Sequence, residues 1–403
     1  MSRLIQGDVG SGKTAVAFGA VWLAYISGYQ TSMMAPTEIL AAQHYENAMK
    51  TLNPMGVHCR LLTGSTRTAE RRQILQELKS GKCQAVFGTH ALISKDVEYG
   101  RLGLVITDEQ HRFGVNQRSN LQLKGKTTAH VPHVLVMSAT PIPRTLALIL
   151  YGDLDLSVID ELPSGRIPVK TRLVPESKRN DMYLFLRNEI AKGKQAYIVC
   201  PLVEEDDDNH ELRSAKELYN SLKNNELSGL RIGLTWGGQK PDEKNRVLHD
   251  FSSGLYDVLV STTVIEVGVN NPNATIMIIE NAERYGLSQL HQLRGRVGRG
   301  SDESWCFLFS EPSEKLRVFC STNDGFVIAQ KDLEIRGPGD LIGTRQSGEA
   351  GNNLLFADVQ LLDEVSKCVQ ELHRDPEQHH DLSVIEQYAL TFFSEDGHTI
   401  ALN

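Results

Sequence analysis

The apolar residues of this 403-residue chain fall mostly into short runs rich in valine and isoleucine, and these runs alternate with segments of helical periodicity. Strands that are buried on both faces give continuous apolar runs, as in parallel sheets covered by helices on each side. The pattern therefore predicts a doubly wound parallel sheet in the first part of the chain. Its expected strands are Arg3–Gln6, Ser32–Ala35, Val57–Leu62, Gln84–Gly88, Leu102–Thr107 and Val134–Ser138.

A second alternating series follows Asp153–Glu176, a stretch whose proline and glycine content is typical of a linker. We therefore predict an α/β fold with two successive lobes, residues 1–155 and 156–310, and a cleft between them. The expected strands of the second lobe are Ala196–Cys200, Arg231–Leu234, Val258–Ser261, Thr275–Ile279 and Trp305–Phe309.

The pattern changes in residues 311–403. Helical stretches flank the glycine-rich segment Arg336–Gly339, and Ala357–Leu372 is expected to form a longer helix. We predict a small, mainly helical C-terminal region.

Composition and charge narrow the class of protein. Hydrophobic residues make up 40% of the chain and the formal net charge is −8, so nucleic acid must be bound by local clusters of cations and not by a generally basic surface. No apolar run of about 18 residues could span a bilayer, and the N-terminus lacks the pattern of a secretion signal. We expect a cytoplasmic protein with no membrane partner. The six cysteines lack metal-ligand spacing and are expected to be reduced thiols.

The segment Gly7–Thr14 reads GDVGSGKT and fits the phosphate-binding pattern G-x-x-x-x-G-K-[ST] between a predicted strand and a predicted helix. Its glycines let the backbone N–H groups face the phosphates, and the helix N-terminus adds a favourable dipole. Lys13 would neutralise the outer phosphates of ATP, and Thr14 would place its hydroxyl on Mg²⁺. The glycines are Gly7, Gly10 and Gly12.

Two carboxylates follow the predicted strand that ends at Thr107. Ligands of open α/β sheets lie beyond the carboxyl ends of the strands. Asp108 is therefore expected to hold Mg²⁺, and Glu109 to orient and deprotonate the attacking water. His111 is expected to sense the nucleotide, the alternative being a packed surface histidine.

Taken in order, these motifs resemble those of the superfamily-two helicases. More narrowly, DEQHRFGV at Asp108–Val115 and MSATPIPRT at Met137–Thr145 are similar to RecG-type helicases and to the related transcription-repair coupling factor, and Ser11 and Gln110 favour the RecG type. The other matching segments are APTE at Ala35–Glu38, STTVIEVGV at Ser261–Val269 and QLRGRVGR at Gln292–Arg299. The resemblance implies two RecA-like lobes, ATP and Mg²⁺ as cofactors, and duplex, forked or Holliday-type junction DNA as the partner.

The resemblance also implies roles in the second lobe. Arg296 and Arg299 would reach across the cleft as arginine fingers, because a fork-shaped, permanent charge can stabilise the transferring phosphoryl group; the alternative is a solvated basic loop. Gln292 would assist catalysis and Gly268 would contact the nucleotide. We expect a monomer, with single-strand-binding protein as a further partner.

Several polar residues are expected to contact DNA or to couple hydrolysis to movement along it. Those that end or follow strands could equally be turns or helix caps. The segment at residues 332–348 resembles the translocation-coupling element of the RecG type, the alternative being a loop that only packs domains together. The residues predicted to contact DNA or to couple hydrolysis to movement are Thr37, Thr63, Gly64, Thr89, Ser138, Thr140, Thr263, Arg336, Arg345 and Gln346.

The chain departs from the RecG pattern in three places. It begins at the strand that leads into the phosphate loop, so we expect the glutamine-bearing adenine site and the N-terminal wedge domain to be absent. Asn270 and Asn271 stand where Asp-Val is usual, and Trp236 begins a segment where His-Gly is usual. Sequence drift in a chain that is no longer under strong functional selection would explain both changes.

Two classes of function follow. The first is an ATP-dependent duplex or branched-DNA translocase or helicase motor acting in replication-fork rescue, recombination and repair. The second is a fragment that binds nucleotide and DNA without productive translocation. Within the enzyme class, displacement of stalled RNA polymerase, as in the transcription-repair coupling factor, is the further alternative.

Overall fold

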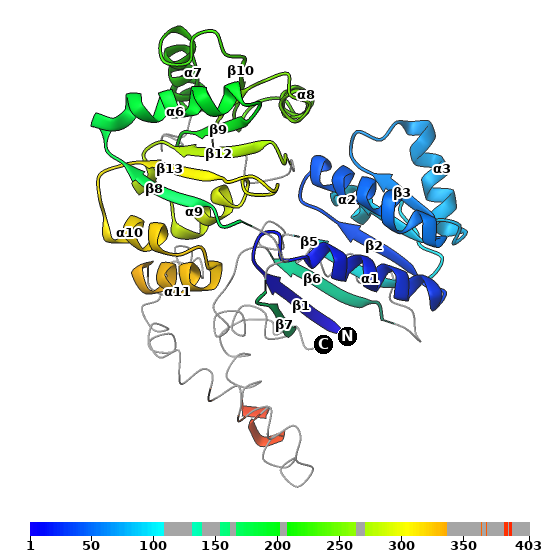
Figure 1. Cartoon of the computed structure of the whole chain (residues 1–403). Helices are drawn as coiled ribbons and strands as arrows, with labels where there is room; N and C mark the ends of the chain where they lie inside the picture. Colours follow the sequence, from blue (N-terminus) through cyan, green and yellow to red (C-terminus); the bar gives the residue numbers. More distant parts are fainter. Residues whose placement is uncertain are drawn as a thin grey trace. The chain divides into compact units, whose positions relative to one another are not determined.

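The computed structural model (Figure 1) describes residues 1–108, 131–138, 154–161, 167–201, 208–262 and 271–336, together with residues 364, 368, 383–385 and 387–388. The chain forms two compact units. The larger comprises Met1–Pro143 and Asp153–Ile335, and the smaller comprises Arg144–Gly152 and Arg336–Asn403. The two α/β lobes both lie in the larger unit.

The first lobe contains a seven-stranded parallel sheet in the order β3-β4-β2-β5-β6-β1-β7. All its strands point the same way, so their carboxyl ends share one edge. β6 separates β1 from β5, with Gln6 opposite Ser138 and Asp108 opposite Met137. The ends of these three strands are therefore neighbours at the ligand-binding edge. The strands are β1 (Ser2–Gly7), β2 (Gln30–Met34), β3 (Cys59–Leu62), β4 (Ala85–Gly88), β5 (Leu102–Asp108), β6 (His133–Ser138) and β7 (Asp155–Ile159).

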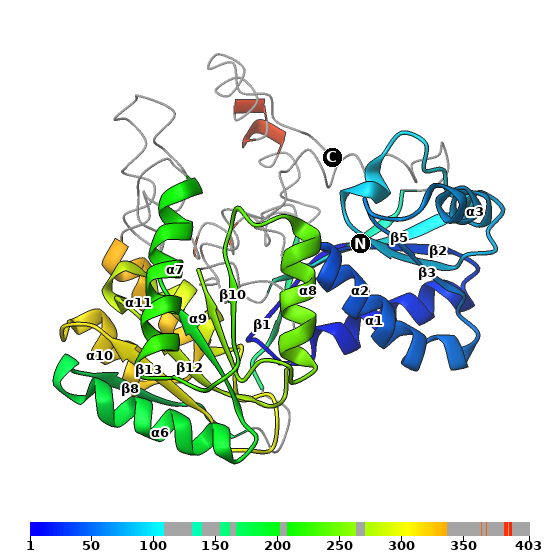
Figure 2. The ribbon, with the colours of Figure 1, turned by 90° about the horizontal axis from the view of Figure 1, so that it is seen from above.

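Helices cover both faces of this sheet, as the continuous apolar runs require. Ile106 packs in a core with residues of α1 (Lys13–Ile26) and α2 (Glu38–Thr51). Its neighbour Val105 packs in a second core with residues of α3 (Thr68–Lys79). Figure 2 shows α1 and α2 together on one side of the strands. Because each buried aliphatic side chain contributes about 1.5–3 kcal/mol, both faces help to stabilise the lobe. Two 3-10 turns, η1 (Asn53–Met55) and η2 (His90–Ile93), complete it.

The second lobe contains a six-stranded parallel sheet in the order β10-β11-β9-β12-β13-β8. One face packs against α6 (Arg179–Ala191) and α7 (Asp208–Asn224), and the other against α8 (Pro241–Ser252) and α9 (Leu287–Arg294). The strands and 3-10 turns are β8 (Lys170–Val174), β9 (Gln195–Val199), β10 (Ile232–Thr235), β11 (Val258–Ser261), β12 (Ala274–Ile279), β13 (Trp305–Phe309), η4 (Glu176–Lys178) and η6 (Ala282–Arg284).

Each strand predicted from the sequence has a counterpart, but two further strands lie in the stretch predicted as a linker. β7 pairs with β1, and β8 pairs with β13. Both are edge strands that carry exposed polar residues, so neither gives the continuous apolar run of a buried strand. The first lobe therefore extends to Ile159, past the predicted boundary at residue 155.

The second predicted boundary, at residue 310, also needs correction. Leu316 and Phe319 of α10 (Glu314–Ser321) and Ile328 of α11 (Gly325–Arg336) belong to the core formed with β12 and β13. These two helices are thus part of the second lobe. The helix predicted at Ala357–Leu372 lies outside the described residues except for 364 and 368. Within the described ranges, no helix is both long and apolar enough to cross a bilayer.

Candidate nucleotide-binding site

The loop between β1 and α1 has the backbone of a phosphate cradle. Gly10 and Gly12 have φ angles of +79° and +93°, a region that residues with a side chain adopt only at a cost. A β-carbon on Gly7 would lie 2.5 Å from the hydroxyl oxygen of Ser11 and 3.1 Å from the carbonyl oxygen of Ile159. In contrast, a β-carbon on Gly12 would meet nothing within 4 Å. The loop is therefore closed at its base and open where α1 begins.

Lys13, the first residue of α1, is buried, and its ammonium group is turned onto the loop itself. Its Nζ donates hydrogen bonds to the carbonyl oxygens of Gly7 at 2.7 Å and Asp8 at 2.8 Å. The buried Ser11 hydroxyl has no hydrogen-bond partner among the described residues. A buried cation, an unsatisfied hydroxyl and a helix N-terminus together make a site suited to an anion. These residues fit the triphosphate predicted from the motif.

A buried carboxylate ends β5, one strand away from β1 and the phosphate loop in the sheet. Asp108 lies 2.7 Å from His44, between Oδ2 of the carboxylate and Nε2 of the imidazole, and both side chains are almost fully buried. His44 shares the inner face of α2 with Ala41 and Ala48. One carboxylate oxygen is thus held by the protein, and Oδ1 is the oxygen better placed to bind a hard cation such as Mg²⁺.

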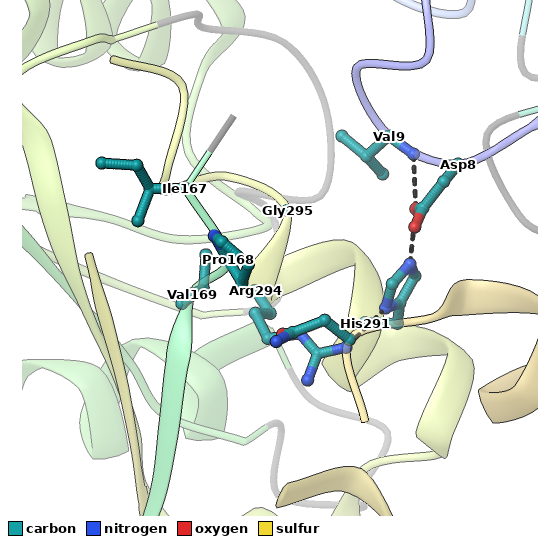
Figure 3. A pocket seen from close by; sticks show the side chains of 9 residues that line it. Asp8, Val9, Ile167, Pro168, Val169, His291, Arg294 and Gly295 are labelled. Carbon is teal, nitrogen blue, oxygen red and sulfur yellow. Dashed lines mark hydrogen bonds and ion pairs between the residues drawn. The ribbon is translucent and has the colours of Figure 1, made fainter. Parts of the chain in front are cut away.

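The segment predicted to carry the arginine fingers lies against the phosphate loop. Nε2 of His291, on α9, is 2.6 Å from Oδ1 of Asp8, which also accepts a 2.6 Å hydrogen bond from the backbone N–H of Val9 (Figure 3). A β-carbon on Gly295 would lie 2.9 Å from that of Val9. Position 295, just before Arg296, therefore has room only for glycine.

Arg296 and Arg299 are half-buried, and their charges are close to β9. Burial raises the pKa of the Tyr197 phenol to about 12, and the nearby charges of Arg296 and Arg299 act in the opposite direction. Arg299 Nε donates to the carbonyl oxygen of Gly295 at 3.1 Å. The contact seen between this segment and the phosphate loop is thus made by His291 and Gly295, and the guanidinium groups follow directly after it.

A small pocket lies beside this contact (Figure 3). The loop residues Asp8 and Val9 form one wall, and α9 with the chain before β8 forms the other. The residues that line it are Asp8, Val9, Ile167, Pro168, Val169, His291, Arg294, Gly295 and Asn323. The pocket therefore shares Asp8 and Val9 with the phosphate loop, whereas Lys13 does not line it.

The residues predicted to touch DNA from the first lobe are partly brought together. Thr37 caps α2 by accepting a hydrogen bond from Leu40 N, and Glu38 accepts hydrogen bonds from the backbone and hydroxyl of Ser65. The loop with Thr63 and Gly64 is therefore fixed to the start of α2. Thr63 also makes hydrogen bonds within its own turn, and the DNA contacts of Thr37 and Thr63 stay a prediction.

Two other hydroxyls at strand ends are buried and unsatisfied among the described residues. These are Thr89 after β4 and Thr262 after β11. Ser138 is buried at the end of β6, opposite Gln6. Gln292 lies half-buried on α9.

The remaining predicted residues stay predictions. The side chain of Arg336, the last residue of α11, lies outside the described part of the chain. The others that lie outside it are Glu109, His111, Thr140, Thr263, Gly268, Arg345 and Gln346.

The departure at Asn271 has a structural explanation. Asn271 is buried, its Nδ2 donates to Gln195 Oε1 at 3.0 Å, and its Oδ1 accepts from the backbone N–H of Asn273 at 3.0 Å. Gln195 in turn donates to the carbonyl oxygens of Phe251 and Tyr256. The asparagine therefore completes a buried polar network. The structure gives no account of the change at Trp236.

The roles of three polar residues of the site were not predicted from the sequence: His44, His291 and Asp8. The partners are 64 and 283 residues apart in the chain, and only the fold brings them together. The one signal in the sequence was the spacing of His44, which places an imidazole among the small apolar residues of α2.

Known protein families match the chain in the order of its lobes. DEAD/DEAH box helicase matches residues 2–149, Helicase conserved C-terminal domain matches residues 178–301, and ATP-dependent DNA helicase RecG, domain 3, C-terminal, matches residues 322–387. The third match is specific to one family and covers the turn after α10, all of α11 and the chain after it.

Individual relatives agree with these family matches. An ATP-dependent DNA helicase RecG from Thermotoga maritima is 50% identical over 379 residues, which are 92% of this chain and 48% of that protein. The Bacillus subtilis protein of the same name is 50% identical over 353 residues, 86% of this chain and 51% of its own length. The chain thus spans about half the length of these relatives.

A solved structure of RecG bound to a three-way DNA junction has a TM-score of 0.73 to this chain at 48% identity. The match covers 85% of this chain and 45% of that one. The shared fold includes both parallel-sheet lobes, and it agrees with the predicted fold class.

Proposed function

Because this chain belongs to the RecG family of ATP-dependent DNA helicases, we propose that it is an ATP-hydrolysing motor that moves along duplex and branched DNA. The observation that carries the proposal is the approach of the arginine-bearing segment to the phosphate loop, through the 2.6 Å contact of His291 with Asp8. When both lobes contact the nucleotide, its hydrolysis can change how the two lobes are arranged. The relatives are ATP-dependent DNA helicases, which fits this arrangement.

Each residue of the cradle has a separate task in the proposed reaction. Lys13 leaves the carbonyl oxygens of Gly7 and Asp8 and binds the outer phosphate oxygens, while the N–H groups at the start of α1 bind the inner ones. Thr14 and Asp108 would hold Mg²⁺, which supplies charge neutralisation on the phosphate oxygens when bound.

The bond-breaking step needs a positioned water and a stabilised transition state. Glu109 follows Asp108 directly and is the proposed base that orients the water and takes its proton. Arg296 and Arg299 are the proposed donors to the charge that spreads over the phosphoryl group, a role worth about a thousand-fold or more in rate.

The proposed DNA contacts lie on the loops that the structure joins at the start of α2. Thr37, Thr63 and Gly64 lie on two segments that the hydrogen bonds of Glu38 to Ser65 join. Phosphate contacts of this kind position a protein on DNA without reading its sequence. Forked and three-way substrates are the proposed targets, since a RecG structure bound to a three-way junction has the same fold. We further propose a cytoplasmic monomer at the nucleoid, with single-strand-binding protein as an additional partner.

A DNA-dependent ATPase assay tests the function. We expect turnover of Mg·ATP that rises at least about tenfold with saturating forked or duplex DNA, because DNA favours the closed arrangement of the site. Lys13→Ala should abolish the stimulated rate, since the cradle loses its only buried ammonium among the described residues. Lys50→Ala, which removes an exposed lysine of α2, is the control and should keep the full rate.

The result also decides between the two classes of function. Turnover that DNA does not stimulate, or that persists in Lys13→Ala, would reject the motor. Binding of nucleotide and of forked DNA with no turnover would identify a fragment that binds but does not move.

A further inference from the structure

We infer that His291 is a positioning residue of the ATPase site, which sets the helix leading to Arg296 against the phosphate loop by a hydrogen bond to Asp8. The inference rests on the proposed function, because it assigns a task within the same nucleotide site. His291 lies one position before the motif QLRGRVGR of Gln292–Arg299, and no role was expected for it from the motif.

The protonation of His291 follows from its partners. Nη2 of Arg294 lies 3.0 Å from Nδ1 of His291, and a guanidinium can only donate. Nδ1 therefore accepts, and Nε2 of the neutral ring carries the hydrogen. Nε2 then donates to Oδ1 of Asp8 at 2.6 Å. A hydrogen bond to a carboxylate is stronger than one between neutral groups, so this contact has a defined direction and an above-average strength.

Asp8 is itself fixed in the loop. The oxygen that accepts from His291 also accepts the backbone N–H of Val9 at 2.6 Å, and the Asp8 carbonyl oxygen accepts from Lys13. A displacement of the Asp8 carboxylate would therefore move the same peptide groups that hold the ammonium of Lys13. The imidazole thus contacts the cradle at a point that is rigidly part of it.

On the other side, His291 is held by an anchored arginine. Arg294 is buried, stacks over the ring of Phe319 at 4.2 Å, and donates to the carbonyl oxygens of Phe319 at 3.1 Å and Thr322 at 2.9 Å. The side chain of Arg294 is thereby fixed to α10 and the turn after it. His291 cannot rotate about its hydrogen bond to Arg294 without losing Asp8.

The first turn of α9 is anchored from a second helix. Asp332 of α11 accepts hydrogen bonds from Leu287 N and Ser288 N, both at 3.2 Å, and from the Ser288 hydroxyl at 2.7 Å. Both ends of α9 are therefore tied to α10 and α11, and these three helices form one block. From this block, His291 makes a hydrogen bond to the phosphate loop.

The consequence concerns Arg296, two residues after the end of α9. With Gly295 packed on Val9, the position of His291 sets where the backbone before Arg296 meets the loop. A catalytic group displaced by about 1 Å can lose about a hundred-fold in rate, whereas ground-state binding by an intact cradle changes little. The inferred task therefore affects turnover more than nucleotide affinity.

The test compares His291→Ala with His291→Gln in the full chain. We expect His291→Ala to lower DNA-stimulated kcat at least about tenfold while the dissociation constant of a fluorescent ATP analogue changes less than about threefold. His291→Gln keeps a side-chain N–H donor and should recover kcat to within about threefold of the unmodified chain. His58→Ala is the matched control, since it removes an imidazole that contacts a different carboxylate, Glu77, at 3.3 Å. Its kcat should be unchanged.

A double substitution tests the pairing itself. If the two side chains act as one unit, adding His291→Ala to Asp8→Ala should lower kcat by less than about a further twofold. A fully additive loss would overturn the pairing. A folded His291→Ala with normal kcat, a rise in dissociation constant alone, or an equal loss in His58→Ala would overturn the inference.

A readout without turnover keeps the inference apart from the proposed function. In the nucleotide-free chain, His291→Ala should speed hydrogen–deuterium exchange in peptides that contain Val9 and Gly295, and leave peptides of α3 unchanged. If the unmodified chain hydrolyses no ATP, the proposed function fails, and this exchange result alone decides the role of His291. Unchanged exchange would refute it. Where His291→Ala does not fold, His291→Gln and Asp8→Asn are measured in the same way.

Discussion

The capping of α9 by Asp332 gives the sharpest stability prediction. The carboxylate of Asp332 accepts three hydrogen bonds from the first turn of α9, two of them from backbone N–H groups. The Leu287 N–H is buried, and without Asp332 it would lose the only acceptor described for it. Replacement by alanine therefore removes a helix cap and leaves a buried donor unsatisfied.

The magnitude follows from these two losses. Loss of a capping side chain costs about 1 kcal/mol, and an unsatisfied buried donor costs about 1–3 kcal/mol. We expect Asp332→Ala to lower the free energy of unfolding of the second lobe by about 3 kcal/mol in total. Asp324→Ala is the matched control, because Asp324 caps α11 at an exposed site by accepting from Phe326 N and Val327 N. Its loss should cost only about 1 kcal/mol.

Equilibrium urea unfolding followed by tryptophan fluorescence measures both variants. The chain has three tryptophans, and in a Trp22→Phe background the remaining two, Trp236 and Trp305, report the second lobe. If Asp332→Ala costs no more than Asp324→Ala, then α9 is not fixed to α11 in the way described, and the rigid block of three helices is refuted.

Three further predictions follow from other contacts. His44→Ala should raise the Mg²⁺ concentration for half-maximal ATPase activity about tenfold, because the partner of a metal-ligating carboxylate tunes its affinity; an unchanged Mg²⁺ titration would refute this role for His44. Hydrogen bonds from Arg60 hold the pKa of Glu77 at about 2, below its usual 4.5, so its stabilising effect is complete above pH 4.5 and is lost as the pH falls towards 2. Glu77→Gln should therefore remove about 2 kcal/mol of pH-dependent stability, after allowance for the partly exposed guanidinium; acid unfolding curves of equal steepness would contradict it. Burial raises the pKa of Cys83 to about 12 and that of Cys59 to about 11, so iodoacetamide at pH 8 should modify the exposed Cys368 and spare both buried thiols, as peptide mass analysis would show.

The central strands were predictable because burial on both faces leaves a plain signal. Val105 and Ile106 are adjacent, face opposite cores and are both fully buried, so the chain must be apolar at each position. β7 and β8 lacked that signal because an edge strand can carry lysine, arginine and aspartate on its solvent-exposed side. Their pairing to β1 and β13 depends on sheet topology, which local composition does not report.

The candidate site was predictable only where its chemistry lies within one segment. Lys13 and the glycines of its loop form a contiguous motif, so their geometry could be expected in advance. His44 and His291 act on residues far away in the chain, and nothing local distinguishes them from packed histidines. Asn271 is the reverse case. It departs from the family pattern, yet its side-chain amide donates a hydrogen bond to Gln195.

Lys13, Arg296 and Arg299 are proposed to act on one bound triphosphate. A crystal structure of the chain with duplex DNA, Mg²⁺ and ADP–aluminium fluoride would measure it directly. We expect Lys13 Nζ to have left the carbonyl oxygens of Gly7 and Asp8, and at least one of the two guanidinium groups to lie within about 3 Å of a fluoride or a phosphate oxygen. An analogue seated in the loop with neither guanidinium group near its phosphate or fluoride atoms, and with Arg299 Nε still bonded to the Gly295 carbonyl oxygen, would contradict it.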